Sequence, residues 1–163
     1  MKKAYEIFFV ILFLLALNFI GHTYHFKSMG LYEDDYYFLG QTLNLSSSEY
    51  HDYMKNTWTK DFQQGRPLGF TLPQVFAFIF RNTHTIDNLY IVGLLILTVN
   101  AVLSFLLFRI ILRKTMPAII GAILFSLFPA DTTKSYLLHI YHIQTALMFC
   151  LMGAIIFLRY RKF

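Results

Sequence analysis

The sequence predicts an all-α membrane protein: a polytopic helical bundle of about four transmembrane helices, with amphipathic interfacial helices in a long first outer loop. Hydrophobic residues make up 56% of the 163 residues and charged residues only 14%, whereas charged residues make up about a quarter of a soluble chain. The mean hydropathy of +0.50 agrees with this class. We expect the whole chain, 1–163, to form a single membrane domain.

The net charge of +5 does not indicate a nucleic-acid partner. The basic residues stand mostly beside hydrophobic runs rather than on one basic face, and orientation in the membrane explains them. The lone cysteine, Cys150, lies within an apolar run. It has no partner for an intrachain disulfide, so we interpret it as a packing residue.

The first span is predicted over 4–23, a length that as a helix crosses about 30 Å of hydrocarbon. The basic start at Lys2 and Lys3 is typical of a signal peptide. However, the apolar run is long and ends without a small-x-small cleavage site, so we predict an uncleaved anchor.

The long outer loop is predicted over 26–88. Within it, Leu45–Ser48 is typical of a helix N-cap and precedes a polar, aromatic helix over 49–62. The stretch Gly65–Gly69 then interrupts the chain. The apolar run 71–80 is too short to cross a bilayer, so we interpret it as an interfacial or re-entrant helix.

Three further spans are predicted over 89–112, 116–130 and 136–158. The middle one is short for a crossing and begins near Pro117, which suits the first turn of a helix. It crosses only if the polar residues 131–133 lie at the far interface or if the bilayer thins locally.

Basic residues predict the orientation in the membrane. They gather at the amino terminus and at the ends of the second and last spans: Lys2, Lys3, Arg109, Arg113, Lys114, Arg159, Arg161 and Lys162. With four crossings they all fall on one side, which the positive-inside rule makes cytoplasmic. We therefore expect a cytoplasmic N-terminus and an outward-facing loop.

The stretch Tyr32-Glu33-Asp34-Asp35-Tyr36-Tyr37 is a candidate active site on this outer loop. Removing a carboxylate from water at a membrane surface costs free energy, so such groups usually pair with a cation, a metal or a proton-transfer partner. The alternative is a plain interfacial loop, because tyrosine favours the headgroup level and acids favour water.

Two polar faces are expected at the outer ends of the first and last spans, since residues at helical spacing share a face. These faces consist of Asn18, His22 and His25, and of Ser135, His139 and His142. Polar faces in a lipid-embedded helix point into the bundle or a wet cavity. The histidines have a simpler interpretation as interfacial anchors, and zinc binding by His139 and His142 lacks a matching Cys/His cluster.

Two further residues have alternative roles. Asp131 either joins the face of His139 or caps the following helix, which is the simpler role. Arg66 is either a solvated turn residue or binds a phosphate at the interface through its planar guanidinium group.

Taken together, these features resemble the polytopic C-type (GT-C) glycosyltransferases, which include the protein mannosyltransferases and the aminoarabinose transferases of lipid A. The resemblance covers the whole chain. Its motifs are the acidic pair Asp34-Asp35 after the first span, the Gly65-Arg66-Pro67-Leu68 stretch, and Asp131 in the next outer loop. It implies transfer of a sugar from a polyprenyl-phosphate carrier in the cell envelope, on the extracytoplasmic face of a bacterial inner or plasma membrane.

In such enzymes a first-loop carboxylate acts as general base or helps to hold a divalent metal. Carried over, the resemblance makes Asp34 or Asp35 catalytic, with Asp131 as the second-loop acid. It makes Asp35 and Asp131 the expected ligands of Mg²⁺ or Mn²⁺. A carboxylate can take the proton of an acceptor hydroxyl, and a cation can stabilise the leaving phosphate. The residues expected to contact the substrate or the lipid phosphate are Arg66, Lys134, His139 and His142.

Members of this family are usually several times longer, with many more spans. We therefore expect this chain to be an N-terminal fragment or one part of a split protein, inactive alone and completed by a second polypeptide. The alternative is a non-enzymatic membrane subunit or scaffold whose aromatic outer loop docks a partner. A small transporter is less favoured, because the spans carry no charge near mid-membrane and no inverted repeat.

Overall fold

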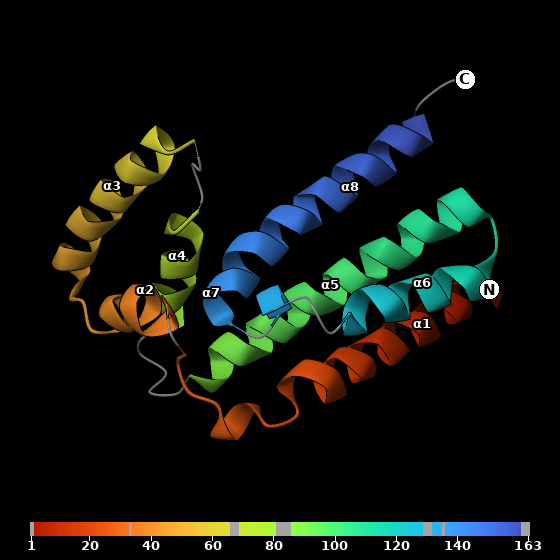
Figure 1. Ribbon diagram of the computed structural model, residues 1–163, viewed down its shortest axis with the longest axis horizontal. Coiled ribbons are helices and arrows are strands. Elements are labelled where there is room, and N and C mark those ends of the chain that lie inside the picture. Colours follow the sequence, from red (N-terminus) through yellow and green to blue (C-terminus); the bar gives the residue numbers. More distant parts are fainter. Residues whose placement is uncertain are drawn as a thin grey trace. The chain divides into compact units, whose positions relative to one another are not determined.

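A computed structural model shows the chain as a series of helices (Figure 1). It describes residues 2–32, 34–65, 69–80, 86–128, 132–134 and 136–160, and these contain helices and turns but no strand. The expectation of an all-helical fold is thereby confirmed.

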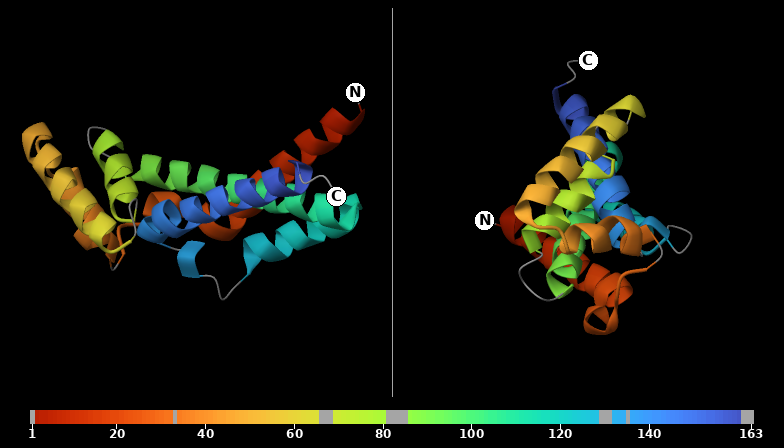
Figure 2. Two further views of the ribbon diagram at one scale, coloured as in Figure 1. Left: turned by 90° about the horizontal axis from the view of Figure 1, so that it is seen from above. Right: turned by 90° about the vertical axis from the view of Figure 1, so that its left-hand side faces the viewer.

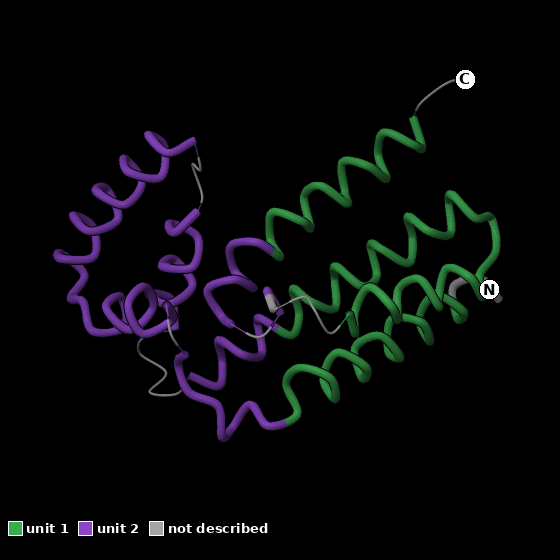
Figure 3. Tube along the Cα trace, in the orientation of Figure 1, with its two compact units in different colours: residues 1–24, 94–132, 144–163 green, residues 25–93, 133–143 purple. Residues whose placement is uncertain are grey.

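The chain divides into two compact units (Figure 3). Unit 1 comprises residues 1–24, 94–132 and 144–163, and unit 2 comprises residues 25–93 and 133–143. Among the described residues, three long helices pass from one unit into the other, namely those over Tyr5–Ser28, Asp87–Leu112 and Leu137–Tyr160.

Among the residues that the structure describes, three helices are long and apolar enough to cross a membrane: Tyr5–Ser28, Asp87–Leu112 and Leu137–Tyr160. The first consists of α1 (Lys2–Asn18), a π-helical turn and a short 3₁₀ turn, and the second is α5. The third consists of α7 (Leu137–His139), a π-helical turn and α8 (Thr145–Tyr160). Their length and composition are compatible with an integral membrane protein.

The predicted short span corresponds to α6 (Thr115–Leu127), which has 13 residues. At 1.5 Å per residue it is about 20 Å long, against a hydrocarbon core of about 30 Å. The apolar helix α4 (Thr71–Phe80) begins and ends at the residues predicted for an interfacial helix. Both helices are apolar but shorter than a standard span.

Apolar packing between α1, α5 and α6 forms the core of unit 1. Its buried members are Val10, Leu14, Ala101, Phe105, Ala118 and Ala122. Small residues on facing helices let the backbones approach closely, which is how helices associate where lipid removes the hydrophobic driving force. The alanines of α5 and α6 supply such positions.

A tight turn reverses the chain between α5 and α6. Arg113 adopts the left-handed conformation with φ 56°, and its N–H donates to the Arg109 carbonyl at 3.0 Å. A residue in this conformation ends a helix by satisfying one of its last carbonyls. Helix α6 therefore runs back along α5.

The basic ends of the unit 1 helices lie together. Arg109 near the end of α5 pairs with Glu6 near the start of α1 at 3.6 Å, so these two helices are antiparallel. In Figure 1 and in the left view of Figure 2, the end of α8 and the start of α1 lie toward the same end of unit 1 as the α5–α6 turn. The charged termini of all four unit 1 helices thus share one end of this unit.

Polar side chains connect the helices of unit 1 in its interior. The Asn100 amide donates to the Gln144 carbonyl at 2.7 Å and to the Gln144 Oε1 at 2.9 Å. Both side chains are 1% exposed. Hydrogen bonds of this kind connect helices inside a membrane, where the alternative is an unsatisfied polar group in hydrocarbon.

Unit 2 contains α2 (Asp34–Leu43), α3 (Ser47–Gln63) and α4, together with the start of α5 and α7. A capping box begins α3: the Ser46 hydroxyl accepts from the Glu49 N–H, and the Glu49 carboxylate accepts from the Ser46 N–H. These bonds satisfy two of the N–H groups that a helix start leaves unpaired. The N-cap predicted around Leu45–Ser48 is confirmed.

Stacked aromatic rings hold the helices of unit 2 against one another. Phe38 of α2 stacks on Phe70, with ring centroids 4.3 Å apart, and Tyr50 of α3 stacks on Phe78 of α4. Phe76 of α4 stacks on Tyr141 at 4.7 Å. Such pairs contribute beyond the area that they bury.

Candidate functional site at the start of α2

The second aspartate of the acidic stretch is buried against the start of the last long helix. The Leu138 N–H donates to Asp35 Oδ1 at 2.7 Å, and the Leu137 N–H donates to Asp35 Oδ2 at 3.2 Å. The Asp35 side chain is 0% exposed. Both of its carboxylate oxygens are therefore engaged by the backbone of α7.

This contact has a simple physical cause. The first N–H groups of a helix have no intrahelical partner and carry a partial positive charge. Tyr136, at the N-cap position of α7, makes no capping bond with its own side chain. Asp35 supplies that cap from α2, and it thereby fastens α2 to the start of the last helix.

The pKa of Asp35 is raised above its ordinary value, and burial is the cause. Backbone hydrogen bonds of Leu138, Tyr32 and Leu137 and the charge of His139 lower this pKa, but burial outweighs them. The side chain therefore keeps a proton at a higher pH than an exposed aspartate does.

The first aspartate of the pair has a different environment. Asp34 is the first residue of α2, and its side chain is exposed. A carboxylate in the first turn of a helix lies beside unpaired N–H groups, which stabilise its charge. Of the two adjacent aspartates, Asp35 thus makes a buried structural contact and Asp34 faces solvent.

The remaining predicted residues of unit 2 contact aromatic rings or lie buried. Lys134 is 3% exposed. The His139 ring lies edge-on to Tyr136 at 5.5 Å, and the His142 ring lies 5.9 Å from Phe70. Within the described part of the chain, no three His, Cys, Asp or Glu side chains gather as a metal site would require.

Two predicted site residues, Arg66 and Asp131, lie outside the described residues, as does Ser135. Of the two predicted metal ligands, Asp35 and Asp131, only Asp35 therefore lies in the described part of the chain. Asp35 has both oxygens committed to the α7 backbone.

The polar face predicted on the first span contributes to packing in unit 1. The Asn18 amide donates to the Leu14 carbonyl at 2.8 Å, one turn earlier. His22 Nε2 lies 2.8 Å from the Ser126 carbonyl, so this ring fastens the π-helical turn Phe19–Thr23, which follows α1, to the end of α6. These contacts favour the anchoring interpretation over a role in a pocket.

Several polar contacts of unit 2 could not be assigned from the sequence. Tyr90 donates to the Gly30 carbonyl at 2.6 Å, and Tyr141 donates to the Leu89 carbonyl at 2.7 Å. Asp61 accepts from the Phe70 and Thr71 N–H groups at the start of α4. Sequence reasoning singled out none of these residues, because nothing in the local pattern marks a partner elsewhere in the chain.

Comparisons with protein-family models, with curated proteins and with solved structures found no match to this chain. The class of the protein follows from its fold: the described part of the chain is all-helical and has three long apolar helices, which is compatible with an integral membrane protein. Its particular activity is a matter of proposal.

Proposed function

We propose that this chain is the N-terminal portion of an integral membrane glycosyltransferase that takes a sugar from a polyprenyl-phosphate carrier on the extracytoplasmic face. In this proposal Asp34 is the general base that removes a proton from the acceptor hydroxyl. The observation that carries it is the contrast within the acidic pair: Asp35 is buried and bonded, whereas Asp34 is exposed.

The difference in exposure between Asp34 and Asp35 supports different roles for the two aspartates. A general base must reach the proton that it abstracts, and the buried, doubly bonded Asp35 cannot do so without releasing α7. Asp35 instead positions the first turn of α2. A base held on a fastened helix is positioned more precisely than one on a free loop.

Four membrane crossings and a cytoplasmic N-terminus in a bacterial inner or plasma membrane are part of the proposal. This topology is supported by the basic ends of the unit 1 helices, which lie on the same side of that unit (Figure 2). In it α6 crosses by local thinning of the bilayer, and α3 and α4 lie at the outer interface.

The leaving lipid phosphate requires a cation, and in this proposal the cation is Arg66. The burial of Lys134 and the ring contacts of His139 and His142 favour structural roles for these three residues. A divalent metal, Mg²⁺ or Mn²⁺, would supply further charge stabilisation. Addition of EDTA to the assay described next tests that requirement.

The test uses membranes of the source cell, which contain any second polypeptide that completes the enzyme. Transfer from a radiolabelled polyprenyl-phosphate sugar is measured with the wild type and with Asp34→Asn. Loss of a general base typically lowers the rate by about 10²–10⁴-fold, so we expect a decrease of at least about 100-fold.

The matched control is Asp52→Asn, which removes an exposed aspartate from α3 in the same unit. This variant should transfer sugar at the wild-type rate. Equal activity of Asp34→Asn and Asp52→Asn would overturn the assignment of the base.

A second candidate function is a non-enzymatic subunit that docks a partner through the outer loop. The observation that favours it is the exposure of aromatic side chains on α2, where Tyr36 is 66% and Tyr37 61% exposed. Exposed apolar patches are typical of interaction sites. Loss of transfer in Tyr36→Ser with Asp34→Asn fully active would favour this function.

A further inference from the structure

An apolar groove with a volume of about 310 Å³ lies between α1 and α6. Its lining residues are Phe9, Val10, Phe13, Met116 and Ile119. Both helices belong to unit 1 and contact each other, whereas Asp34 belongs to unit 2. The groove therefore does not include the residue that carries the proposed transfer reaction.

The floor and the walls of this groove differ in burial. Val10 is 7% exposed and belongs to the core of unit 1, and Ile119 packs against that core. Phe9, Phe13 and Met116 are 65%, 46% and 67% exposed, so they form the walls. Phe9 and Phe13 are four residues apart and therefore share one face of α1. The groove is thus open at the surface and closed beneath by the core.

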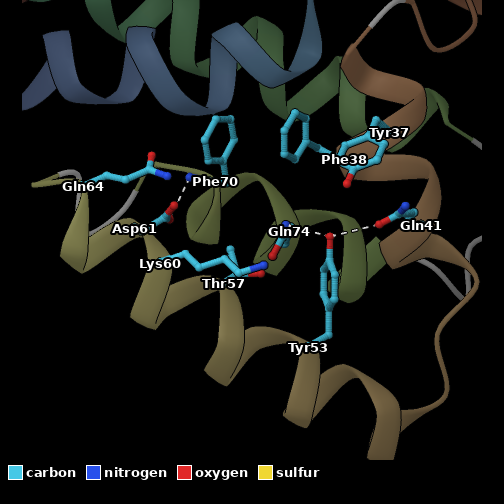
Figure 4. Close-up of a pocket in the computed structure, with 10 residues that line it drawn as sticks. All are labelled: Tyr37, Phe38, Gln41, Tyr53, Thr57, Lys60, Asp61, Gln64, Phe70 and Gln74. Atoms are coloured by element: carbon cyan, nitrogen blue, oxygen red, sulfur yellow. Dashed lines mark hydrogen bonds between the residues drawn. The ribbon is translucent and has the colours of Figure 1, made fainter.

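The lining determines what the groove can hold. The cavity between α2, α3 and α4 in unit 2 has a similar volume, about 310 Å³, but its lining includes Lys60, Asp61 and Gln74 (Figure 4). In the described part of unit 1, no polar side chain lines the groove between α1 and α6. A polar ligand would lose its hydrogen bonds to water there without replacing them. The groove therefore suits hydrocarbon.

A membrane supplies hydrocarbon of this shape as the acyl chains of its lipids. The helix over Tyr5–Ser28, which contains one wall of the groove, has the length and composition of a membrane span. The volume lies at the lower end of the range of about 300–1,000 Å³ for small-molecule cavities, so the groove suits a section of one acyl chain. Such a chain gains dispersion contacts with the rings of Phe9 and Phe13 on one side and with Met116 on the other.

The chain is basic where it enters the groove wall at the start of α6. Arg113 and Lys114 immediately precede α6, three and two residues before Met116. Both side chains are exposed, and neither makes an ion pair with another described residue. Arg109, by contrast, is paired with Glu6 at 3.6 Å. Two positive charges therefore stand within one turn of the lining and are available to an anion.

We propose that this groove binds one acyl chain of an anionic glycerophospholipid, whose phosphate headgroup contacts Arg113 and Lys114. A zwitterionic lipid offers the same acyl chain, but the cation in its own headgroup reduces the attraction to these two residues. Each basic residue near a membrane surface strengthens the binding of an anionic lipid about fivefold. The proposal requires unit 1 to lie in a bilayer, but it is independent of the proposed sugar transfer.

Binding is measured by fluorescence quenching with the full chain in lipid vesicles. In a Trp58→Phe background, Ile120→Trp places a tryptophan one turn beyond Met116, at an exposed position that does not line the groove. The probes are dibromo-phosphatidylglycerol and dibromo-phosphatidylcholine, each at the same mole fraction in unbrominated phosphatidylcholine. We expect a preference for phosphatidylglycerol of at least about fivefold. Equal quenching by the two brominated lipids would overturn the proposal.

The contribution of charge is tested by removing both cations. Arg113→Gln with Lys114→Gln should abolish the preference for phosphatidylglycerol at the Ile120→Trp reporter. The matched control is Lys55→Gln with Lys60→Gln, which removes two exposed lysines from α3 and should leave the preference unchanged. A preference that survives the loss of Arg113 and Lys114 would contradict the assigned headgroup contact.

The contribution of the groove is tested through its α1 wall. Phe9→Ala with Phe13→Ala removes that wall, so phosphatidylglycerol that is spin-labelled on its acyl chain should exchange faster with the surrounding lipid. The matched control is Phe8→Ala with Leu12→Ala, which shortens two exposed apolar side chains of α1 that do not line the groove. Its exchange rate should equal that of the wild type. Equal rates in the two double variants would exclude the groove as the site.

A second reporter separates the groove from a general attraction to basic helix ends. Phe157→Trp, again in the Trp58→Phe background, is exposed on α8 two residues before Arg159 and does not line the groove. It should show a weaker preference for phosphatidylglycerol than Ile120→Trp does, and equal preferences would contradict a defined site. Because Asp34→Asn should bind the lipid normally, loss of transfer and loss of lipid binding can be told apart.

Discussion

Asp34 and Asp35 are adjacent in sequence, but their surroundings give them different chemistry. Asp35 accepts two N–H groups of α7 and is excluded from solvent, whereas Asp34 faces solvent at the helix start. Sequence reasoning identified the pair but could not tell which aspartate is buried, because the Leu138 N–H that binds Asp35 lies 103 residues further along the chain. Burial, rather than residue type, decides which aspartate is structural.

At the residue scale, Asp35→Ala should destabilise the protein. It leaves the N–H groups of Leu137 and Leu138 without an acceptor in a buried place, a loss that typically costs about 1–3 kcal/mol. Chemical unfolding in detergent measures the change. Asp52→Ala, which removes an exposed carboxylate, should leave the unfolding free energy nearly unchanged, and equal effects of the two variants would contradict the cap.

The same residue makes stability depend on pH with a defined sign. Burial raises the pKa of folded Asp35, whereas its unfolded pKa is about 3.9. The folded state therefore binds this proton more tightly, and the stability that Asp35 contributes falls as the pH rises from about 4 through the raised pKa. Asp35→Asn lacks this titration, so its stability deficit should shrink between acid and neutral pH; a growing deficit would contradict the raised pKa.

At the scale of the element, the helices of unit 2 are connected by caps that come from other helices. Asp61 in the last turns of α3 accepts three bonds at the start of α4, from the Phe70 N–H, the Thr71 N–H and the Thr71 hydroxyl. The sequence predicted the extent of α4 correctly, because a ten-residue, mostly apolar run after the stretch Gly65–Gly69 forms a local pattern. It gave no sign of Asp61, since a cap from another helix has no fixed spacing.

We expect Asp61→Ala to loosen the start of α4. The N–H groups of Phe70 and Thr71 lose their acceptor, at a typical cost of about 1–3 kcal/mol, and the stack of Phe70 on Phe38 loses its support. Amide hydrogen exchange should accelerate at residues 70–74 and stay unchanged in α6. Uniformly faster exchange in both helices, or no change at Thr71, would contradict the assigned cap.

At the scale of the whole molecule, hydrophobic length indicates helices compatible with a membrane protein but leaves the number of crossings open. Three helices meet the length of a span, whereas α6, with 13 residues, is about 20 Å long. The tight turn at Arg113 directs α6 back along α5. Whether α6 completes a crossing determines on which side the last helix ends.

Labelling of a single cysteine distinguishes the two topologies. In a Cys150→Ser background, Arg159→Cys at the end of α8 should be protected from a membrane-impermeant maleimide in intact cells, because four crossings place it in the cytoplasm. Asn56→Cys on α3 should be labelled. Labelling of Arg159→Cys would mean that α6 does not cross, and the proposed topology would be wrong.

The sequence by itself determined the all-helical fold and the extents of most helices, because apolar length and helix-capping residues act over a few neighbouring positions. The tertiary structure decided what the polar residues do. Asp35 caps α7, Asp61 caps α4, and His22 binds the end of α6. A buried polar group must find a partner wherever the fold supplies one, and such partners lie far away in sequence.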